Sequence, residues 1–354
     1  MESPTKANTR VRTGGASPVA GDMMDAIVYR QYGPPEVLAL EQVPRPAVGE
    51  DDVMVRVRAS SVNPYEWHFM RGEPYLARLE MGLKPKNGRL GVDVAGTVEA
   101  VGSKVTEFQR GDEVFGTCEG AFAEYAVGSE SSLVAKPANV SFEQAGVVGI
   151  AGLTAVQGLR DFGRVRAGQT VLINGAAGGV GTFAVQIAKV WGAEVTGVCS
   201  SRNVDMVGTI GADHVIDYTR EDFTHGAKHY DLMLDLIGNH SLSRCRRVLA
   251  PNGTFVMLGG QSGRWIRPID RVFETLLLSP FVSQDLVLGR AVWTREDLLV
   301  LQGLLATGQV STVIDRTYPL SQVPEAIRYL EEGHARGKVV ITAGDAETAQ
   351  REER

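Results

Sequence analysis

A glycine-rich turn between an apolar strand and an amphipathic helix constrains the fold more than any other feature. Residues 171–181 are Val-Leu-Ile-Asn-Gly-Ala-Ala-Gly-Gly-Val-Gly, which place Ala, Gly and Gly at the three positions of a G-x-G-x-x-G series. In this setting the glycines admit a pyrophosphate and bring the helix close to the sheet, while amides at the helix start face the phosphate charge. The turn therefore predicts a dinucleotide site whose phosphate contacts are Ala176, Ala177, Gly178, Gly179, Val180 and Gly181.

Around this turn, apolar strands alternate with amphipathic helices. Strand patterns cover residues 170–174, 194–199, 214–217, 231–237 and 254–258, and helical patterns cover residues 182–191 and 204–210. Strands joined by helical crossovers lie parallel in one sheet. This part of the chain is therefore predicted to be α/β, a Rossmann doubly wound parallel sheet of five strands.

The rest of the chain has a different sequence pattern. From residue 26 to about residue 140 the sequence is β-rich, with frequent Gly and Pro and no long amphipathic helix, which indicates a partly open barrel or sandwich. Helical patterns follow at residues 295–307 and 323–333. A last strand at residues 338–342 has no place in the parallel series, so it is expected to return to the first domain. The predicted limits are 24–145 and 291–343 for the β-rich domain and 146–290 for the Rossmann domain, with 1–23 and 344–354 disordered.

Composition excludes several classes of function. The 354 residues carry 36 basic and 42 acidic side chains, a net charge of −6 without a basic stripe, which argues against nucleic acid as a partner. No apolar run is long enough for a membrane span. Three scattered cysteines favour a reducing compartment and a cytoplasmic protein. The first 22 residues are either a loose tail, with translation starting at Met23 or Met24, or a weak match to a transit peptide.

The end of the second parallel strand indicates which nicotinamide cofactor is bound. Enzymes that prefer NAD place an acid there, on the ribose 2′-hydroxyl. Here the sequence is Cys-Ser-Ser-Arg-Asn at residues 199–203 and holds no acid. Two hydroxyls and a guanidinium suit a 2′-phosphate, so Ser200, Ser201 and Arg202 predict NADPH. The alternative for Arg202 is a solvated residue at a helix start.

Five short motifs in order resemble a known family. They are residues 61–64 (Ser-Val-Asn-Pro), 91–96 (Gly-Val-Asp-Val-Ala-Gly), 152–155 (Gly-Leu-Thr-Ala), 176–181 and 337–340 (Gly-Lys-Val-Val). Together they resemble the medium-chain dehydrogenase/reductase superfamily and, within it, the zinc-independent quinone oxidoreductase-like branch. The resemblance implies a GroES-like β-rich catalytic domain built from both ends of the chain, an inserted Rossmann domain, a cofactor cleft between them, and a homodimer.

The resemblance also implies further cofactor contacts. Tyr218 resembles a tyrosine that flanks the adenosine 2′-phosphate in NADPH-dependent members. In the family, two strand ends lie along the nicotinamide half of the cofactor, and they correspond here to Ile237, Gly238, Leu258, Gly259 and Gly260. Two further positions on the cofactor side correspond to Thr154 and Lys338. For each of these residues the alternative is turn chemistry or packing.

Zinc is predicted to be absent. Asn63 occupies the region of the first cysteine ligand in zinc-dependent relatives, and Val92-Asp93 stands where those relatives carry histidine and glutamate. Zinc-dependent relatives also have a lobe with four cysteines, and the corresponding region of this chain has only Cys118. His68, Cys118 and Glu119 form no convincing site, since a partly buried histidine and a small apolar filler explain the first two.

Without a metal, the protein must orient the reactants and stabilise the oxygen that gains charge when hydride is delivered. The candidate catalytic residues are Asn63, Tyr75 and Tyr65, whereas Asp93 is expected to hold loops together. The favoured function is an NADPH-dependent, zinc-free reductase of a quinone or an α,β-unsaturated carbonyl compound. The alternatives are an alcohol dehydrogenase or carbonyl reductase of the same fold, and a non-catalytic NADPH-binding partner protein.

Overall fold

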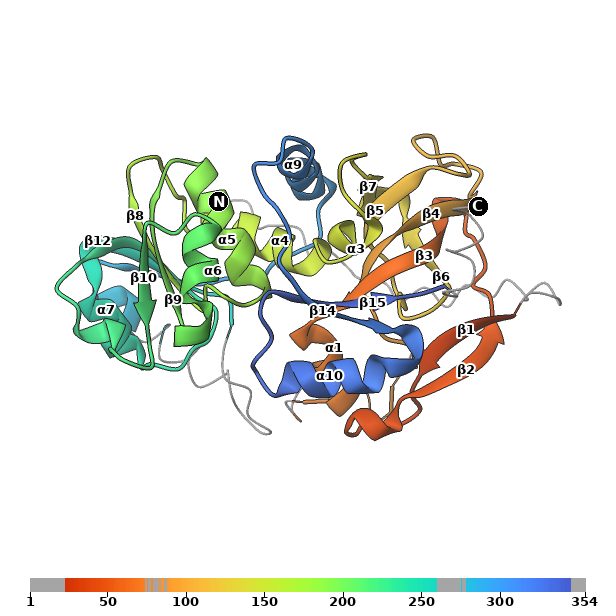
Figure 1. The fold of residues 1–354 in the computed structure, drawn as a ribbon, viewed down its shortest axis with the longest axis horizontal. Helices are drawn as coiled ribbons and strands as arrows, with labels where there is room; N and C mark the ends of the chain where they lie inside the picture. Colours follow the sequence, from red (N-terminus) through yellow and green to blue (C-terminus); the bar gives the residue numbers. More distant parts are fainter. Residues whose placement is uncertain are drawn as a thin grey trace.

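A computed structural model describes residues 23–73, 75, 78, 82, 84–85, 88–259, 275 and 278–344. These residues form two sheets with helices packed between and around them (Figure 1). The short 3-10 turns lie at Pro35–Val37, Glu130–Ser132, Ser201–Asn203, Phe223–His225, Ser279–Phe281 and Leu320–Gln322, and a π-helical turn lies at Gly158–Phe162.

The first sheet has seven strands drawn from both ends of the chain. Its order is β14 (Ile314–Pro319), β15 (Lys338–Thr342), β3 (Asp52–Val62), β4 (Asp93–Val101), β5 (Glu113–Thr117) and β7 (Leu133–Ala135), with β6 (Tyr125–Ser129) also paired to β3. A separate hairpin joins β1 (Met23–Val28) and β2 (Ala39–Pro44). Strand β15 runs antiparallel to β3, which confirms that the last strand returns to the first domain.

Two helices lie side by side beneath this sheet (Figure 1). They are α1 (Pro64–Arg71) and α10 (Val323–Glu331), and the guanidinium of Arg71 pairs with the carboxylate of Glu331 at 2.5 Å. The short helix α1, of eight residues, was not predicted from the sequence, and no long helix interrupts the β-rich stretch among its described residues. Asn63 caps this helix and Pro64 takes its first position. A proline there starts a helix because its missing N–H has no helical partner in the first turn.

The second sheet is parallel, in the order β10 (His214–Asp217), β9 (Glu194–Cys199), β8 (Thr170–Asn174), β11 (Tyr230–Asp235), β12 (Leu249–Met257) and β13 (Asp285–Leu288). It has one strand more than expected, because β13 follows a stretch without a clear strand pattern. The chain order reverses between β8 and β11, so the carboxyl ends of these two strands flank a topological switch point. The predicted fold class, a GroES-like domain with a Rossmann sheet, is confirmed.

Helices join the two sheets into one core. Helices α5 (Gly179–Val190), α6 (Val204–Thr209) and α7 (Leu242–Arg247) pack against the parallel sheet. Helices α3 (Phe142–Ala145) and α9 (Arg295–Ala306) contact strands of the first sheet, and α4 (Gly149–Gln157) connects the two parts. Figure 1 places α4 between the sheets, where it contacts α5, α9 and β5. A continuous apolar cluster runs from Phe115 of the first sheet through Leu301 of α9 to Ile173 of the second. The domain limits of 24–145, 146–290 and 291–343 stay a prediction, since this shared core marks no sharp boundary.

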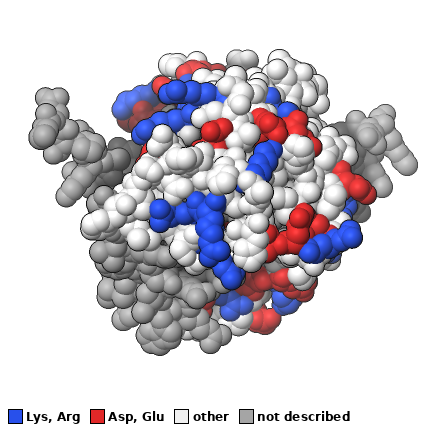
Figure 2. All heavy atoms as spheres, turned by 90° about the vertical axis from the view of Figure 1, so that its left-hand side faces the viewer, with Lys and Arg blue, Asp and Glu red and all other residues white. Residues whose placement is uncertain are grey.

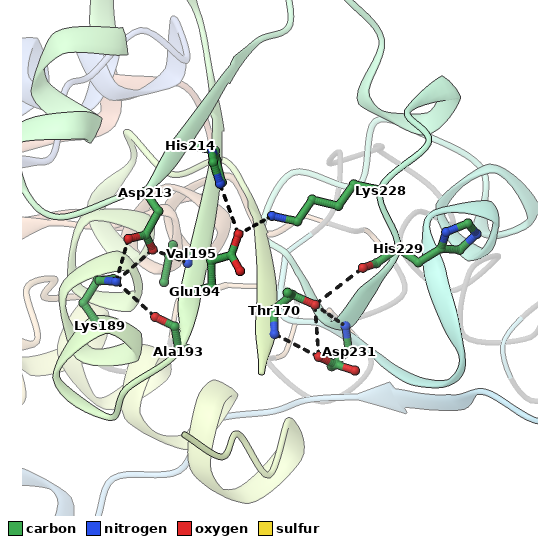
Figure 3. Close-up of polar contacts among 10 residues, drawn as sticks. All are labelled: Thr170, Lys189, Ala193, Glu194, Val195, Asp213, His214, Lys228, His229 and Asp231. Atoms are coloured by element: carbon green, nitrogen blue, oxygen red, sulfur yellow. Dashed lines mark hydrogen bonds and ion pairs between the residues drawn. The ribbon is translucent and has the colours of Figure 1, made fainter. Parts of the chain in front are cut away.

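Charged side chains tie the amino ends of the parallel strands together (Figure 3). Glu194 at the start of β9 bonds both Lys228, at 2.6 Å, and the ring of His214, at 3.1 Å. Asp213 likewise bonds Lys189 and the amide of Val195. These charged side chains find their partners within the Rossmann part of the chain. The amino ends of the parallel strands are therefore structural, and the carboxyl ends are the expected side for a ligand.

The surface agrees with the charge balance of the sequence. Figure 2 shows basic and acidic side chains interspersed over the face of the Rossmann side. Among the described residues visible in that view, no broad single-sign field forms, of the kind that binds nucleic acid. No helix in the described part of the chain combines the length and the apolar character needed to cross a bilayer.

Candidate functional site

The glycine turn has the geometry that a dinucleotide requires. It lies between β8 and α5, and Gly175 has a φ of +94°, a conformation that favours glycine. A Cβ on Gly181 would lie 2.1 Å from the carbonyl oxygen of Gly175, so only glycine lets helix and turn approach this closely. Gly178 precedes α5 without a side-chain cap, and a Cβ placed on it would meet nothing closer than 3.5 Å. The first amides of α5 are therefore accessible to phosphate oxygens.

This turn is hydrogen-bonded directly to the other domain. The amide of Gly337 donates to the carbonyl of Ala177 at 2.8 Å, and Gly178 and Gly337 form an isolated parallel bridge. A Cβ on Gly179 would come within 2.9 Å of the Cδ atom of Lys338. The start of β15 therefore lies against the predicted phosphate-binding turn, which brings Lys338 to the junction of the two domains.

A buried polar network surrounds Asp93 at this junction. The Oδ2 atom of Asp93 accepts from Ser61 Oγ at 2.5 Å and from Asn63 Nδ2 at 3.0 Å, and it lies 3.3 Å from Lys338 Nζ. Its Oδ1 atom accepts from the amide of Ile150 at 2.7 Å. Asp93 is 0% exposed and Lys338 is 3% exposed. Asp93 thus joins three elements through hydrogen bonds, which confirms its expected role.

Asn63 is held at both ends of its side-chain amide. Its Oδ1 atom accepts from Lys338 Nζ in a short hydrogen bond, while its Nδ2 atom donates to Asp93. The amide plane is therefore fixed and Lys338 is oriented. The side-chain hydrogen bonds of Asn63 described above go to Lys338 and Asp93. Its predicted contact with the reactants therefore stays a prediction. Thr154, on α4, donates to the carbonyl of Ile150 at 2.7 Å and lies one helical turn from the same network.

Glu66 is the buried acid that the sequence analysis missed. Its Oε2 atom accepts from the amide of Asn63 at 2.8 Å, and its Oε1 atom has no hydrogen-bond partner among the described residues. Burial, together with the nearby charge of Asp93, raises the pKa of Glu66 to about 8, although Lys338 acts in the opposite direction. At neutral pH its carboxyl group is protonated. The sequence Asn-Pro-Tyr-Glu contained the signal for this residue, since a cap followed three positions later by Glu indicates a helix start.

Aromatic rings gather beside this network. The ring of Tyr65 lies 4.4 Å from that of Phe69 and 6.1 Å, edge-on, from that of Trp293. Burial raises the pKa of Tyr65 to about 12, with Glu66 and Glu119 acting in the same direction and Arg290 against it. The Tyr65 hydroxyl therefore keeps its proton and can donate a hydrogen bond at physiological pH. Neither Trp293 nor Arg290 was singled out from the sequence.

The third candidate catalytic residue has other neighbours. The ring of Tyr75 lies under the guanidinium of Arg78 at 4.5 Å, and Arg78 also lies over the ring of Tyr32 at 4.9 Å. These described contacts place Tyr75 in a cation–π cluster at the end of α1. The structure brings Asn63 and Tyr65 together and records no contact of Tyr75 with either of them among the described residues.

The residues predicted to face a 2′-phosphate lie at the ends of β9 and β10. The hydroxyl of Ser201 bonds the carboxylate of Asp217 at 2.5 Å and the hydroxyl of Thr219 at 2.8 Å. Arg202 donates to the carbonyl of His334, and Tyr218 is 55% exposed. Ser200 directly precedes the 3-10 turn Ser201–Asn203. The hydrogen bond from Ser201 lowers the pKa of Asp217, so an ionised acid that the sequence analysis did not consider lies in this corner.

The predicted nicotinamide side lies at the carboxyl ends of β11 and β12. The Oδ1 atom of Asp235 accepts from the amides of Ile237, at 3.2 Å, and Gly238, at 2.9 Å. The amides of Leu258 and Gly259 both donate to the carbonyl of Asp235. Ile237 is 42% exposed, so this strand end offers an apolar surface to a ligand. Gly260 lies outside the described residues.

Metal ligands do not gather in the part of the chain that the structure describes. No group of three or more His, Cys, Asp or Glu side chains is placed there to hold an ion. Cys118 is buried in an apolar cluster, and burial raises its pKa to about 12. His68 stacks on Trp67 at 3.8 Å.

Comparison with known proteins agrees with this geometry. A family model described as "Alcohol dehydrogenase GroES-like domain" matches residues 49–138, and one described as "Zinc-binding dehydrogenase" matches residues 210–341. The chain is 32% identical over 340 residues to the "Chloroplast envelope quinone oxidoreductase homolog" of Arabidopsis thaliana, covering 91% of this chain and 99% of that protein. It is 33% identical over 333 residues to the "2-methylene-furan-3-one reductase" of Solanum lycopersicum, covering 90% and 79%.

A solved structure shows the same architecture. The quinone oxidoreductase from Coxiella burnetii superimposes with a TM-score of 0.80 at 32% identity, over 91% of this chain and 100% of that chain. The chain belongs to the medium-chain dehydrogenase/reductase superfamily, in its quinone oxidoreductase-like branch. It is an oxidoreductase of a family that uses a nicotinamide dinucleotide.

Proposed function

We propose that this protein is an NADPH-dependent, zinc-free reductase that delivers hydride to a quinone or an α,β-unsaturated carbonyl compound. The observation that carries the proposal is the junction at Gly337. There the phosphate-binding turn, the Asp93–Asn63–Lys338 network and the strand between them form one hydrogen-bonded unit. The aromatic rings of Tyr65 and Trp293 lie beside this unit.

The residues present fit a reduced dinucleotide. The amides of Gly179 and Val180 would hold its pyrophosphate, Ser201 and Arg202 would hold its adenosine half, and Ile237 would offer an apolar surface to its nicotinamide half. When bound, the cofactor supplies the hydride. The protein contributes orientation, because Asp93 fixes Asn63 and Lys338 at the junction, and it contributes charge, because Lys338 places a buried cation there.

Tyr65 is the proposed hydrogen-bond donor to the substrate. Hydride addition to a conjugated carbonyl leaves negative charge on the carbonyl oxygen, and a preorganised donor stabilises that charge. Tyr65 is half-buried among aromatic rings and its hydroxyl remains protonated. The neutral Glu66 and the Asn63 amide to which it is bonded hold the start of α1, and with it the position of Tyr65.

The preference for NADPH rests on Ser201, Arg202 and Tyr218, and it must overcome the charge of Asp217. We expect calorimetry to detect tighter binding of NADPH than of NADH. Arg202→Gln should raise the Kd for NADPH about tenfold, the value of one charge-assisted hydrogen bond. It should leave the Kd for NADH unchanged, and Arg166→Gln, at an exposed loop position remote from the corner, should change neither. Equal affinity of the wild type for both coenzymes would remove the assigned preference.

Consumption of NADPH, followed by its near-ultraviolet absorbance, tests the substrate class. A quinone, a short enone and a saturated ketone are supplied in parallel at matched concentrations. Turnover of the first two supports the proposal. Turnover of the ketone alone would favour the carbonyl reductase, and tight NADPH binding without any turnover would favour the non-catalytic alternative. Tyr65→Phe should lower kcat about 100-fold with little change in the Kd for NADPH.

A further inference from the structure

A cavity lies beside the β1–β2 hairpin, away from the junction of the two domains. Its volume is about 330 Å³, at the lower end of the range for small-molecule sites. The described residues that line it are Val28, Tyr29, Arg30, Val43, Pro44, Pro46, Gly88 and Arg89. Figure 1 shows the hairpin on the right of the molecule and the parallel strands on the left. None of these lining residues belongs to the glycine turn or to the Asp93 network, so the cavity is separate from the site described above.

Main-chain pairing fixes the walls of this cavity. The amide of Tyr29 donates to the carbonyl of Gly88 at 2.9 Å, and Val28 and Arg89 form an isolated antiparallel bridge. Strand β1 also pairs with β2 along its whole length. Gly88 has a φ of +59°, and a Cβ on it would lie 3.0 Å from the carbonyl oxygen of Tyr29. The close approach of the two segments therefore depends on glycine, and the walls are in place before a ligand arrives.

Arg89 brings a positive charge to this cavity. Its side chain lies along Gly120, because a Cβ on Gly120 would be 3.3 Å from both the Cβ and the Nε atoms of Arg89. The side chain is half-buried, and the structure records no hydrogen bond or ion pair to its guanidinium among the described residues. Burial lowers the pKa of Arg89, with the charge of Glu119 acting in the opposite direction. An arginine nevertheless stays charged in a protein, so an anion at this position would stabilise the half-buried cation.

The second guanidinium of the cavity, that of Arg30, already has a partner. Its two terminal nitrogens donate to the two carboxylate oxygens of Glu41, at 2.5 Å and 2.7 Å. Apart from Tyr29 and Gly88, the other lining residues are two valines and two prolines, which present an apolar wall. The cavity thus combines one guanidinium that can accept a new partner with an apolar surface. This combination suits an anion that carries an apolar body.

We propose that this cavity is a second ligand site, which binds a small carboxylate with an aromatic or branched aliphatic body. The carboxylate pairs with Arg89, because a planar guanidinium can donate two parallel hydrogen bonds to it. The apolar body packs against the valines and prolines, and burial of its surface adds affinity. The proposal goes beyond the reductase activity and does not depend on it, since the site shares no residue with the junction at Gly337.

Calorimetry with 2-naphthoate and 2-naphthamide tests the proposal, because the two probes share the ring system and differ in charge. The wild type should bind 2-naphthoate at least about tenfold more tightly than the amide. Arg89→Met should raise the Kd for 2-naphthoate about tenfold and leave the Kd for the amide within about twofold. Arg89→Lys should recover part of the loss, because it keeps the charge without the two parallel hydrogen bonds. Arg166→Met, in an exposed loop, is the matched control and should bind as the wild type does.

The titrations are run with and without saturating NADPH. An unchanged Kd for 2-naphthoate supports a separate site, whereas loss of its binding in the presence of NADPH would place the probe in the cofactor cleft and overturn the proposal. Absence of binding by the wild type, equal affinity for acid and amide, or an unchanged Kd in Arg89→Met would also overturn it. Thermal scanning and NADPH titration of each variant should match the wild type, which shows that the fold is intact. If NADPH fails to bind but 2-naphthoate binds through Arg89, the proposed function is wrong and this inference stands.

Discussion

The buried carboxyl of Glu66 makes the stability of this protein depend on pH. In the folded chain burial raises its pKa to about 8, against an ordinary value of 4.5 for a glutamate in water. A pKa that is higher in the folded state means that the native protein binds the proton more tightly. The stabilising protonation is fully present below about pH 4.5 and is lost as the pH rises toward 8.

The size of the effect follows from linkage. One proton is released on ionisation of a single group, so stability falls by about 1.4 kcal/mol per pH unit within that window. Between pH 6 and pH 8 the loss from Glu66 is about 2 kcal/mol. For a chain of 354 residues, an unfolding entropy of roughly 2.1 cal/mol/K per residue converts this loss to a decrease of about 3 °C in Tm.

Glu66→Gln isolates this contribution. The amide oxygen of glutamine can still accept from the Asn63 amide, and glutamine cannot ionise. Tm is measured by thermal scanning at half-unit steps of pH for the wild type, Glu66→Gln and Glu332→Gln, the last at an exposed position of similar chemistry. The difference between Glu66→Gln and the wild type should grow by about 3 °C from pH 6 to pH 8, whereas Glu332→Gln should run parallel to the wild type. A constant difference across this range would show that Glu66 does not titrate there and would refute the reasoning.

Two further predictions concern the junction and the turn. In Gly181→Ala the new Cβ would meet the carbonyl of Gly175, so the variant should lose about 1–3 kcal/mol of stability in chemical denaturation and should not bind NADPH in calorimetry. The control Gly208→Ala, whose Cβ would meet nothing within 4 Å, should gain about 0.5–1 kcal/mol. Equal effects of the two substitutions would count against the close approach at Gly181. Lys338→Met should cost about 3–5 kcal/mol, because it leaves the charge of Asp93 buried and unpaired. Adding Asp93→Asn should recover part of that loss in the same assay, and strict additivity of the two changes would contradict their coupling.

Most of the fold could be predicted from the sequence because strand and helix patterns alternate clearly in the Rossmann half. The glycine turn and the returning last strand were both predictable, since each depends on a local pattern. Strand β13 and helix α1 were missed for different reasons. β13 is a four-residue strand without alternation, and α1 is a helix of only eight residues, too short for a clear helical pattern.

The site was less predictable than the fold because its parts come from distant segments. Lys338 lies 245 positions from Asp93 and 275 from Asn63, and no local pattern pairs them. Trp293 follows the edge strand of the other sheet and reaches Tyr65 only through the tertiary fold. Asp217 escaped notice because the argument from charge considered only residues 199–203, although Tyr218, the next residue after Asp217, was assigned to the same corner.

The hydrogen bond from Gly337 to Ala177 has a consequence for motion. A cleft between two domains opens by rotation about the points where the domains remain attached, and this contact is such a point. The phosphate-binding turn and the lysine that follows Gly337 must therefore move as a single body. Two consecutive residues, Gly337 and Lys338, thus connect the predicted phosphate-binding turn of one domain to the buried Asp93 of the other.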